Sequence, residues 1–194
     1  MGAPVTLEDW VEFLNACYQQ HEERLQTKFH RSLPFQDAVF DRWERARRLG
    51  FGEGTSIYNS SAVFGDVRVG QNTWIGPNTV LDGSGGGLII GSFCSVSAAV
   101  HIYTHDTVLW ALSGGELPKA EAMVSVGDCV YIGSQSVIAA GVTVGARSVI
   151  AANSFVNDDV PDGSVVGGSP ARRLGVVVGQ GSKVRIEFDG EKEG

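Results

Sequence analysis

The side chain best suited to chemistry is His105, which lies in the run Tyr103-Thr104-His105-Asp106. An imidazole takes up and releases protons near neutral pH, because its ordinary pKa is about 6.5. A long excursion to Lys119 follows this run and interrupts an otherwise regular pattern. Catalytic groups concentrate in loops that a rigid scaffold carries. His105 is therefore predicted to be a general base, with its ring oriented by Asp106 or by a backbone carbonyl.

A second candidate is Asp82, which opens the stretch Asp82-Gly83-Ser84-Gly85-Gly86-Gly87. A glycine cluster can cradle a phosphate, but the Gly-Lys-Ser/Thr element of a phosphate loop is absent and no helix is expected to follow. A bulged turn is the favoured interpretation of this stretch.

Nucleophilic and metal-dependent chemistry find less support in the sequence. Gly-x-Ser-x-Gly is absent, and no cysteine lies beside a histidine. His101 precedes His105 by four residues and is expected at an interface, with metal binding as its alternative role. A zinc site of three histidines would lack an obvious third ligand, so no metal is expected.

These candidates interrupt a repeat of six residues. Its apolar position is occupied in turn by Ile57, Val63, Val69, Ile75, Leu81, Ile90, Val96, Ile102, Val126, Ile132, Ile138, Val144, Ile150 and Val156. A period of six is even and suits strands, in which side chains alternate, whereas a helix repeats at 3.6. A glycine follows the apolar residue in six units and is expected to permit a tight turn. Stacked units of this kind predict a parallel β-solenoid.

The residues between inward positions must point outward, and they sort onto three faces. Two faces are partly apolar, one with Ala62, Val80, His101, Val137 and Phe155, the other with Trp74, Ser95, Tyr131 and Val149. The third is mostly polar, with Arg68, Thr107, Ser125, Thr143 and Pro161. Exposed apolar faces usually mark interfaces. A prism that buries two faces against copies of itself closes a ring of three, so a homotrimer is predicted.

The flanking segments differ from the repeat in composition. We expect an N-terminal helical segment over 1–50, the repeat over 51–174, and a strand pair with tail over 175–194. A helix is predicted over 7–31, with Thr6 and Asp9 forming a capping box, and a second from about 37 to 49. The apolar stripe of the first helix is expected to be a docking face. The helices could instead cap the first coil of the solenoid.

Charge and cysteine content narrow the choice of partners and compartment. The net charge of −7 over 194 residues disfavours nucleic acid, and no apolar run approaches the ~18 residues of a membrane span. The three cysteines share no metal-ligand spacing and are expected to be small buried side chains. Their odd number and the absence of a secretory pattern at the start predict a cytoplasmic protein.

Three features together resemble the hexapeptide-repeat acyltransferases, whose fold is a left-handed parallel β-helix, and above all the maltose and galactoside sugar O-acetyltransferases. They are Thr104-His105, the run 126–134 and the closing Gly168-Ser169-Pro170-Ala171-Arg172. The resemblance covers roughly residues 57–174. It implies a homotrimer that binds acetyl-CoA in the groove between neighbouring prisms.

The resemblance also assigns roles to residues by position. His105 matches the general base, and Asp82 falls where relatives bind the acceptor. Trp110, in the loop after His105, is a further candidate for binding the substrate. Ser134 and Ala152 match positions along the pantetheine arm of CoA, and Arg172, assisted by Arg173, matches a basic residue near its nucleotide end. Asn157-Asp158 stands where some relatives have Thr-Lys, which questions one cationic contact with CoA.

The function that follows is transfer of an acetyl group from acetyl-CoA to a sugar hydroxyl, with no covalent enzyme intermediate. Surface-polysaccharide assembly would be one setting for it. The first alternative is N-acetylation of a nucleotide-linked amino sugar, which a histidine base would serve equally. A metal-dependent hydratase on the same fold and a non-catalytic trimeric scaffold are further alternatives.

Overall fold

The structure is a computed structural model that describes residues 6–190, and the chain divides into two compact units, Met1–Arg42 and Trp43–Gly194. The first unit contains helices α1 (Leu7–Phe29) and α2 (Phe35–Val39). The predicted capping box is confirmed: Thr6 accepts from the Asp9 N–H, and the Asp9 carboxylate accepts from the Thr6 N–H. No side chain of α1 is buried, so its apolar stripe stays exposed.

The single helix predicted from about 37 to 49 is wrong, because the structure has two helices there. Helix α2 ends at Val39 and α3 spans Arg42–Arg48. Phe40 between them is extended, with φ −99° and ψ 135°, which breaks the helical hydrogen bonding. Ala46 and Phe51 are buried in the same core as the repeat, and the Arg45 guanidinium donates to the Tyr58 and Ser61 carbonyls. The end of the helical segment therefore covers the first coil.

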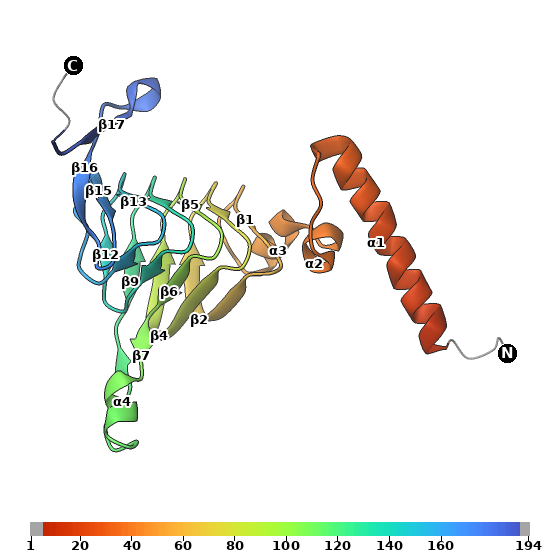
Figure 1. Ribbon diagram of the computed structural model, residues 1–194, viewed down its shortest axis with the longest axis horizontal. Helices are drawn as coiled ribbons and strands as arrows, with labels where there is room; N and C mark the ends of the chain where they lie inside the picture. Colours follow the sequence, from red (N-terminus) through yellow and green to blue (C-terminus); the bar gives the residue numbers. More distant parts are fainter. Residues whose placement is uncertain (1–5, 191–194) are drawn as a thin grey trace. The chain divides into compact units, whose positions relative to one another are not determined.

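The second unit is a coil of short parallel strands, as predicted (Figure 1). One sheet has the order β1 (Ser56–Ile57), β3 (Trp74–Ile75), β5 (Ser95–Val96), β10 (Tyr131–Ile132), β13 (Val149–Ile150), β15 (Ser164–Gly167), β16 (Arg172–Val178), β17 (Arg185–Phe188). The other has the order β12 (Thr143–Val144), β9 (Val124–Val126), β4 (Val80–Ile90), β6 (His101–Tyr103), β11 (Val137–Ile138), β14 (Phe155–Val156), with β2 (Ala62–Val69) also pairing with β4. The fold is therefore a parallel β-helix, as the repeat predicts.

The predicted apolar ladder forms the core. Every residue of it is buried except Val63, which is half-buried and packs against the others. The pairing also confirms the two apolar outer faces, since it aligns Val80, His101, Val137 and Phe155 on one face and Trp74, Ser95, Tyr131 and Val149 on the other.

The third face differs from the prediction at two positions. Ile89 lies between Arg68 and Ser125 in the place expected for Thr107, because β4 continues through the glycine cluster to Ile90. Thr107 instead precedes helix α4 (Val108–Leu112) in the excursion. Val160 forms the bridge to Val144, so the last coil is shorter than the regular repeat and Pro161 falls outside the ladder.

The repeat glycines serve a purpose other than the predicted one. Gly70, Gly76, Gly91, Gly127, Gly133 and Gly145 do not adopt positive φ; the left-handed turn positions belong to other residues, with φ from 52 to 61°. Those residues are Asn72, Asn78, Phe93, Ala99, Cys129, Gln135, Arg147 and Asn153. A Cβ atom on Gly133 would lie 2.4 Å from the Ala152 backbone nitrogen. Glycine is required here because successive coils approach too closely for a side chain.

The predicted C-terminal strand pair is confirmed as β16 and β17, which extend the first sheet in antiparallel fashion. A short 3-10 turn, η1 (Gly181–Lys183), joins them. The hairpin and the coil line an open pocket of about 680 Å³, whose residues include Val149, Val177, Ile186 and Cys129. The expectation that all cysteines are buried is wrong: Cys94 is buried, Cys17 is partly exposed and Cys129 is exposed. Within residues 6–190, no helix has the length and apolarity needed to span a membrane.

Candidate active site

The glycine-rich stretch and the histidine run lie side by side in the coil. Asp82 on β4 pairs in register with Tyr103 on β6. Thr104 is fully buried; its hydroxyl donates to the Asp82 carbonyl and accepts from the Gly85 N–H, both at 2.8 Å. A Cβ atom on Gly85 would lie 2.3 Å from the Thr104 carbonyl oxygen. The glycine cluster is thus a bulged part of β4 that packs directly against the chain entering His105.

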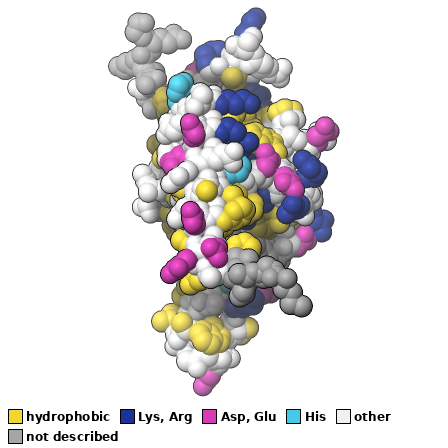
Figure 2. Space-filling view, turned by 90° about the vertical axis from the view of Figure 1, so that its right-hand side faces the viewer, with side chains coloured by type: hydrophobic (Ala, Val, Ile, Leu, Met, Phe, Trp, Pro, Cys, Tyr) yellow, Lys and Arg dark blue, Asp and Glu magenta, His cyan; other side chains and the backbone are white. Residues whose placement is uncertain are grey.

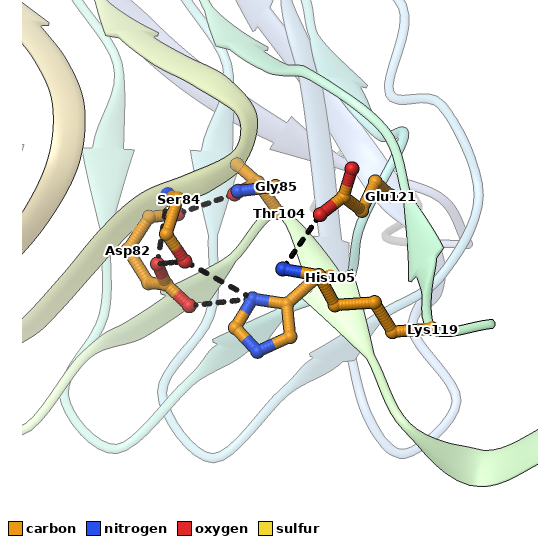
Figure 3. A network of polar contacts seen from close by, with 7 residues as sticks. All are labelled: Asp82, Ser84, Gly85, Thr104, His105, Lys119 and Glu121. Atoms are coloured by element: carbon orange, nitrogen blue, oxygen red, sulfur yellow. Dashed lines mark hydrogen bonds and ion pairs between the residues drawn. The ribbon is translucent and has the colours of Figure 1, made fainter. Parts of the chain in front are cut away.

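The Asp82 carboxylate orients the His105 ring (Figure 3). His105 Nδ1 lies 3.0 Å from Asp82 Oδ2, and the two side chains are 29% and 6% exposed. Asp82 Oδ1 accepts from the Ser84 hydroxyl at 2.6 Å and from the Ser84 N–H at 2.9 Å. Ser84 Oγ is also 3.4 Å from His105 Nδ1. Both carboxylate oxygens of Asp82 are therefore engaged within the chain, and direct contact of Asp82 with an acceptor stays a prediction.

The Asp82–His105 contact determines which ring nitrogen can act as a base. An ionised carboxylate only accepts hydrogen bonds, so Nδ1 carries the proton that faces Asp82. The Nε2 atom points away from Asp82 and Ser84 and keeps its lone pair (Figure 3). A neutral imidazole held in this way accepts a proton at Nε2, and the adjacent carboxylate stabilises the imidazolium that forms.

Asp106, which the sequence suggested as the orienting group, acts elsewhere. Its Oδ1 accepts from the Val108 N–H at 3.0 Å at the start of α4. The short strands β7 (His105–Asp106) and β8 (Ala120–Glu121) pair antiparallel and form the base of an arm that carries α4 away from the coil (Figure 1). Trp110 is exposed on α4, and hydrophobic side chains gather over this arm at the bottom of the space-filling view (Figure 2). Trp110 lies on α4, beyond the β7–β8 base that contains His105.

The two residues expected along the pantetheine arm lie at one corner of the coil. Ser134 and Ala152 occupy turns of successive coils, and the Asn153 N–H donates to the Ser134 carbonyl at 2.9 Å. Ser134 is half-buried, whereas Ala152 is exposed. They therefore lie on adjacent turns along this corner.

The two arginines expected near the nucleotide end of CoA have acidic neighbours. Arg172 Nη1 lies 3.7 Å from Asp158 Oδ2, and Arg173 Nε lies 3.0 Å from Asp189 Oδ2. Both arginines line a pocket of about 380 Å³ between β14 and β16, together with Asp158 and Asp159. Asp158 stands where some relatives have a lysine. The Arg172 guanidinium, a candidate to replace that missing cation, lies beside the Asp158 carboxylate.

Three residues of the site were not among the candidates singled out from the sequence. Ser84 binds the Asp82 carboxylate, and the aromatic residues Phe64 and Tyr103 pair in register with Asp82 on either side. Phe64 precedes Asp82 by three units of six residues, so the repeat itself was a signal for it. Tyr103 follows Ile102 as Asp82 follows Leu81 in the apolar ladder, so the repeat was a signal for it as well.

The hydratase alternative requires several ligands in one place. Among residues 6–190 there is no group of three or more histidine, cysteine, aspartate or glutamate side chains that could hold a metal ion. His101 instead lies beside Tyr103, with its Nδ1 3.3 Å from the tyrosine hydroxyl.

Comparisons with known proteins agree with this architecture. Residues 123–158 match the family described as bacterial transferase hexapeptide (six repeats). Serine acetyltransferase 4 of Arabidopsis thaliana is 28% identical over 92% of this chain and 48% of its own length. The chain thus spans about half the length of the curated serine acetyltransferases it matches.

Solved structures show the same fold. The hexapeptide-repeat containing acetyltransferase VCA0836 of Vibrio cholerae matches 84% of this chain and 92% of its own, with 29% identity and a TM-score of 0.61. That protein has also been crystallised with acetyl coenzyme A. Galactoside acetyltransferase in complex with coenzyme A matches 90% of this chain and 92% of its own, with 23% identity and a TM-score of 0.59.

Proposed function

Because this chain resembles the hexapeptide-repeat acyltransferases in both its repeat and its coil, we propose that it is an acetyl-CoA-dependent acetyltransferase. The observation that carries the proposal is the Asp82–His105 pair at the start of the arm. It supplies an oriented general base on a scaffold that related proteins use for acetyl transfer. VCA0836, crystallised with acetyl coenzyme A, supports the choice of donor.

In the proposed reaction, His105 Nε2 removes the proton from an acceptor hydroxyl as its oxygen attacks the thioester carbonyl carbon. The tetrahedral intermediate collapses with cleavage of the carbon–sulfur bond, and the imidazolium returns the proton to the CoA sulfur. Asp82 stabilises the imidazolium in between. Holding both substrates in one groove contributes proximity, and no covalent enzyme intermediate is needed.

The acceptor in this proposal is a sugar hydroxyl. L-Serine is a second candidate, because a serine acetyltransferase is similar over 92% of this chain. The amine of a nucleotide-linked amino sugar is the third. Ser134, Ala152, Arg172 and Arg173 are proposed to bind CoA, with Trp110 at the acceptor, and the site is proposed to be completed in a homotrimer in the cytoplasm.

The test measures release of the CoA thiol from acetyl-CoA with hexopyranosides, L-serine and a nucleotide-linked amino sugar as acceptors. We expect a hexopyranoside to give the highest kcat/KM. His105→Ala should lower turnover by about 10²–10⁴-fold, the range for loss of a general base. His30→Ala, in the other unit, is the matched control. Near-normal turnover in His105→Ala would contradict the proposal.

A further inference from the structure

Asp82 lies between two aromatic residues in one row across the second sheet. Strands β2, β4 and β6 are neighbours, and Phe64 pairs with Asp82 while Asp82 pairs with Tyr103. Side chains alternate along a strand, and the preceding row of Val63, Leu81 and Ile102 faces the core. The side chains of Phe64, Asp82 and Tyr103 therefore all point to the outer side of the sheet. Neighbouring strands are about 4.8 Å apart, so Asp82 has an aromatic residue as its in-register neighbour on each side.

The two rings differ in how they are held. Phe64 is 54% exposed, although it lies next to a carboxylate that is almost fully covered. Tyr103 is half-buried; its ring meets the His101 ring edge-on at a centroid distance of 5.9 Å, and its hydroxyl is 3.3 Å from His101 Nδ1. Tyr103 is thus fixed before a ligand arrives, and Phe64 offers apolar surface that a ligand would cover.

The charges around His105 disfavour an anionic acceptor. Asp82 contacts the ring, and Glu121 pairs in register with His105 on the neighbouring strand. The nearby cation Lys119 is already engaged, with its Nζ 2.6 Å from Glu121 Oε1 (Figure 3). Asp82 and Glu121 are two carboxylates against the single cation Lys119, so the group as a whole repels the carboxylate of an amino acid and leaves an uncharged ring unaffected.

We propose that Phe64 and Tyr103 are the specificity-determining residues of this site, and that they select a cyclic, uncharged acceptor such as a pyranose. The C–H face of the ring would lie against the aromatic side chains while one hydroxyl reaches His105 Nε2. Sites of this type combine aromatic walls with a few converging polar groups. The inference rests on the proposed function, since it assigns the acceptor of that same reaction.

The test separates binding from turnover. Binding of a panel of methyl hexopyranosides is measured by saturation-transfer NMR without acetyl-CoA, and KM and kcat are measured by thiol release. Phe64→Ala should weaken pyranoside binding and raise its KM about tenfold, with kcat nearly unchanged and the KM for acetyl-CoA unaffected. Phe64→Tyr and Tyr103→Phe should retain binding because each keeps an aromatic ring.

Phe93→Ala is the matched control, because Phe93 is 61% exposed in a turn between β4 and β5. It should leave the KM for pyranosides unchanged, and thermal unfolding should confirm that all variants fold. Pyranoside binding that depends on Phe64, without acetyl transfer, would support the inference and overturn the proposed function. Acetyl transfer to pyranosides with a KM insensitive to Phe64→Ala would support the proposed function and overturn the inference. Absence of pyranoside binding to the wild-type chain, or a preference for L-serine, would overturn the inference.

Discussion

The Nδ1 atom of His105 lies 3.0 Å from the Oδ2 atom of Asp82, and this contact joins the two interruptions of the repeat. One interruption supplies a buried carboxylate and the other a partly exposed imidazole. Thr104, between them, is bonded to the backbone of both Asp82 and Gly85. The two insertions are therefore parts of one site.

Asp82→Asn should lower kcat about 10²–10⁴-fold, because an amide can present its N–H to Nδ1 and favour the wrong tautomer of His105. Asp106→Asn is the matched control, since the Asp106 carboxylate binds the Val108 N–H and not the ring. The measurement is thiol release across pH with the acceptor that gives the highest kcat/KM. Equal effects of the two variants would show that Asp82 does not position the base.

Gly133→Ala should lower the free energy of unfolding by about 1–3 kcal/mol, as overpacking does, because the added Cβ would meet the backbone of Ala152. Gln135→Gly, two residues further on, should cost little, since Gln135 has φ 61° and glycine adopts this conformation readily. Urea unfolding of both variants checks the pair. The reverse order would mean that the glycines are required for turn conformation rather than for close stacking.

The cysteines should differ in reactivity toward a thiol-specific reagent. Burial raises the pKa of the Cys94 thiol, which lowers its thiolate fraction at neutral pH, and its side chain is covered. Cys129 is exposed and should be modified first, whereas Cys94 should react only after unfolding. Mass spectrometry of peptides from native and denatured protein measures this order. Rapid modification of Cys94 in the native protein would contradict the packing described here.

The chain should have a mass in solution of about three times 20.6 kDa by light scattering. Val137→Glu places a charge on the apolar outer face between His101 and Phe155 and should dissociate the assembly. Ser125→Glu, on the mostly polar third face, is the control and should leave the mass unchanged. A monomeric wild-type chain would remove the homotrimer from the proposal.

The repeat was sufficient to predict the fold and most of the core. A period of six with an apolar residue at one position admits few architectures, and the burial of Ile57, Ile102 and Ile138 follows directly from it. His105 was likewise identifiable, because it stands beside the only long excursion. The break at Phe40 was not, since Val39, Phe40 and Trp43 continue a helical pattern while the backbone turns extended at Phe40.

What the sequence by itself determined is therefore the coil, its inward ladder and the histidine at the base of the arm, because these depend on a local period. The tertiary structure alone decided that Asp82, and not Asp106, orients His105. It also decided that glycine is needed for the spacing between coils. These relationships depend on side-chain contacts and on the spacing between different coils, which a local period does not specify.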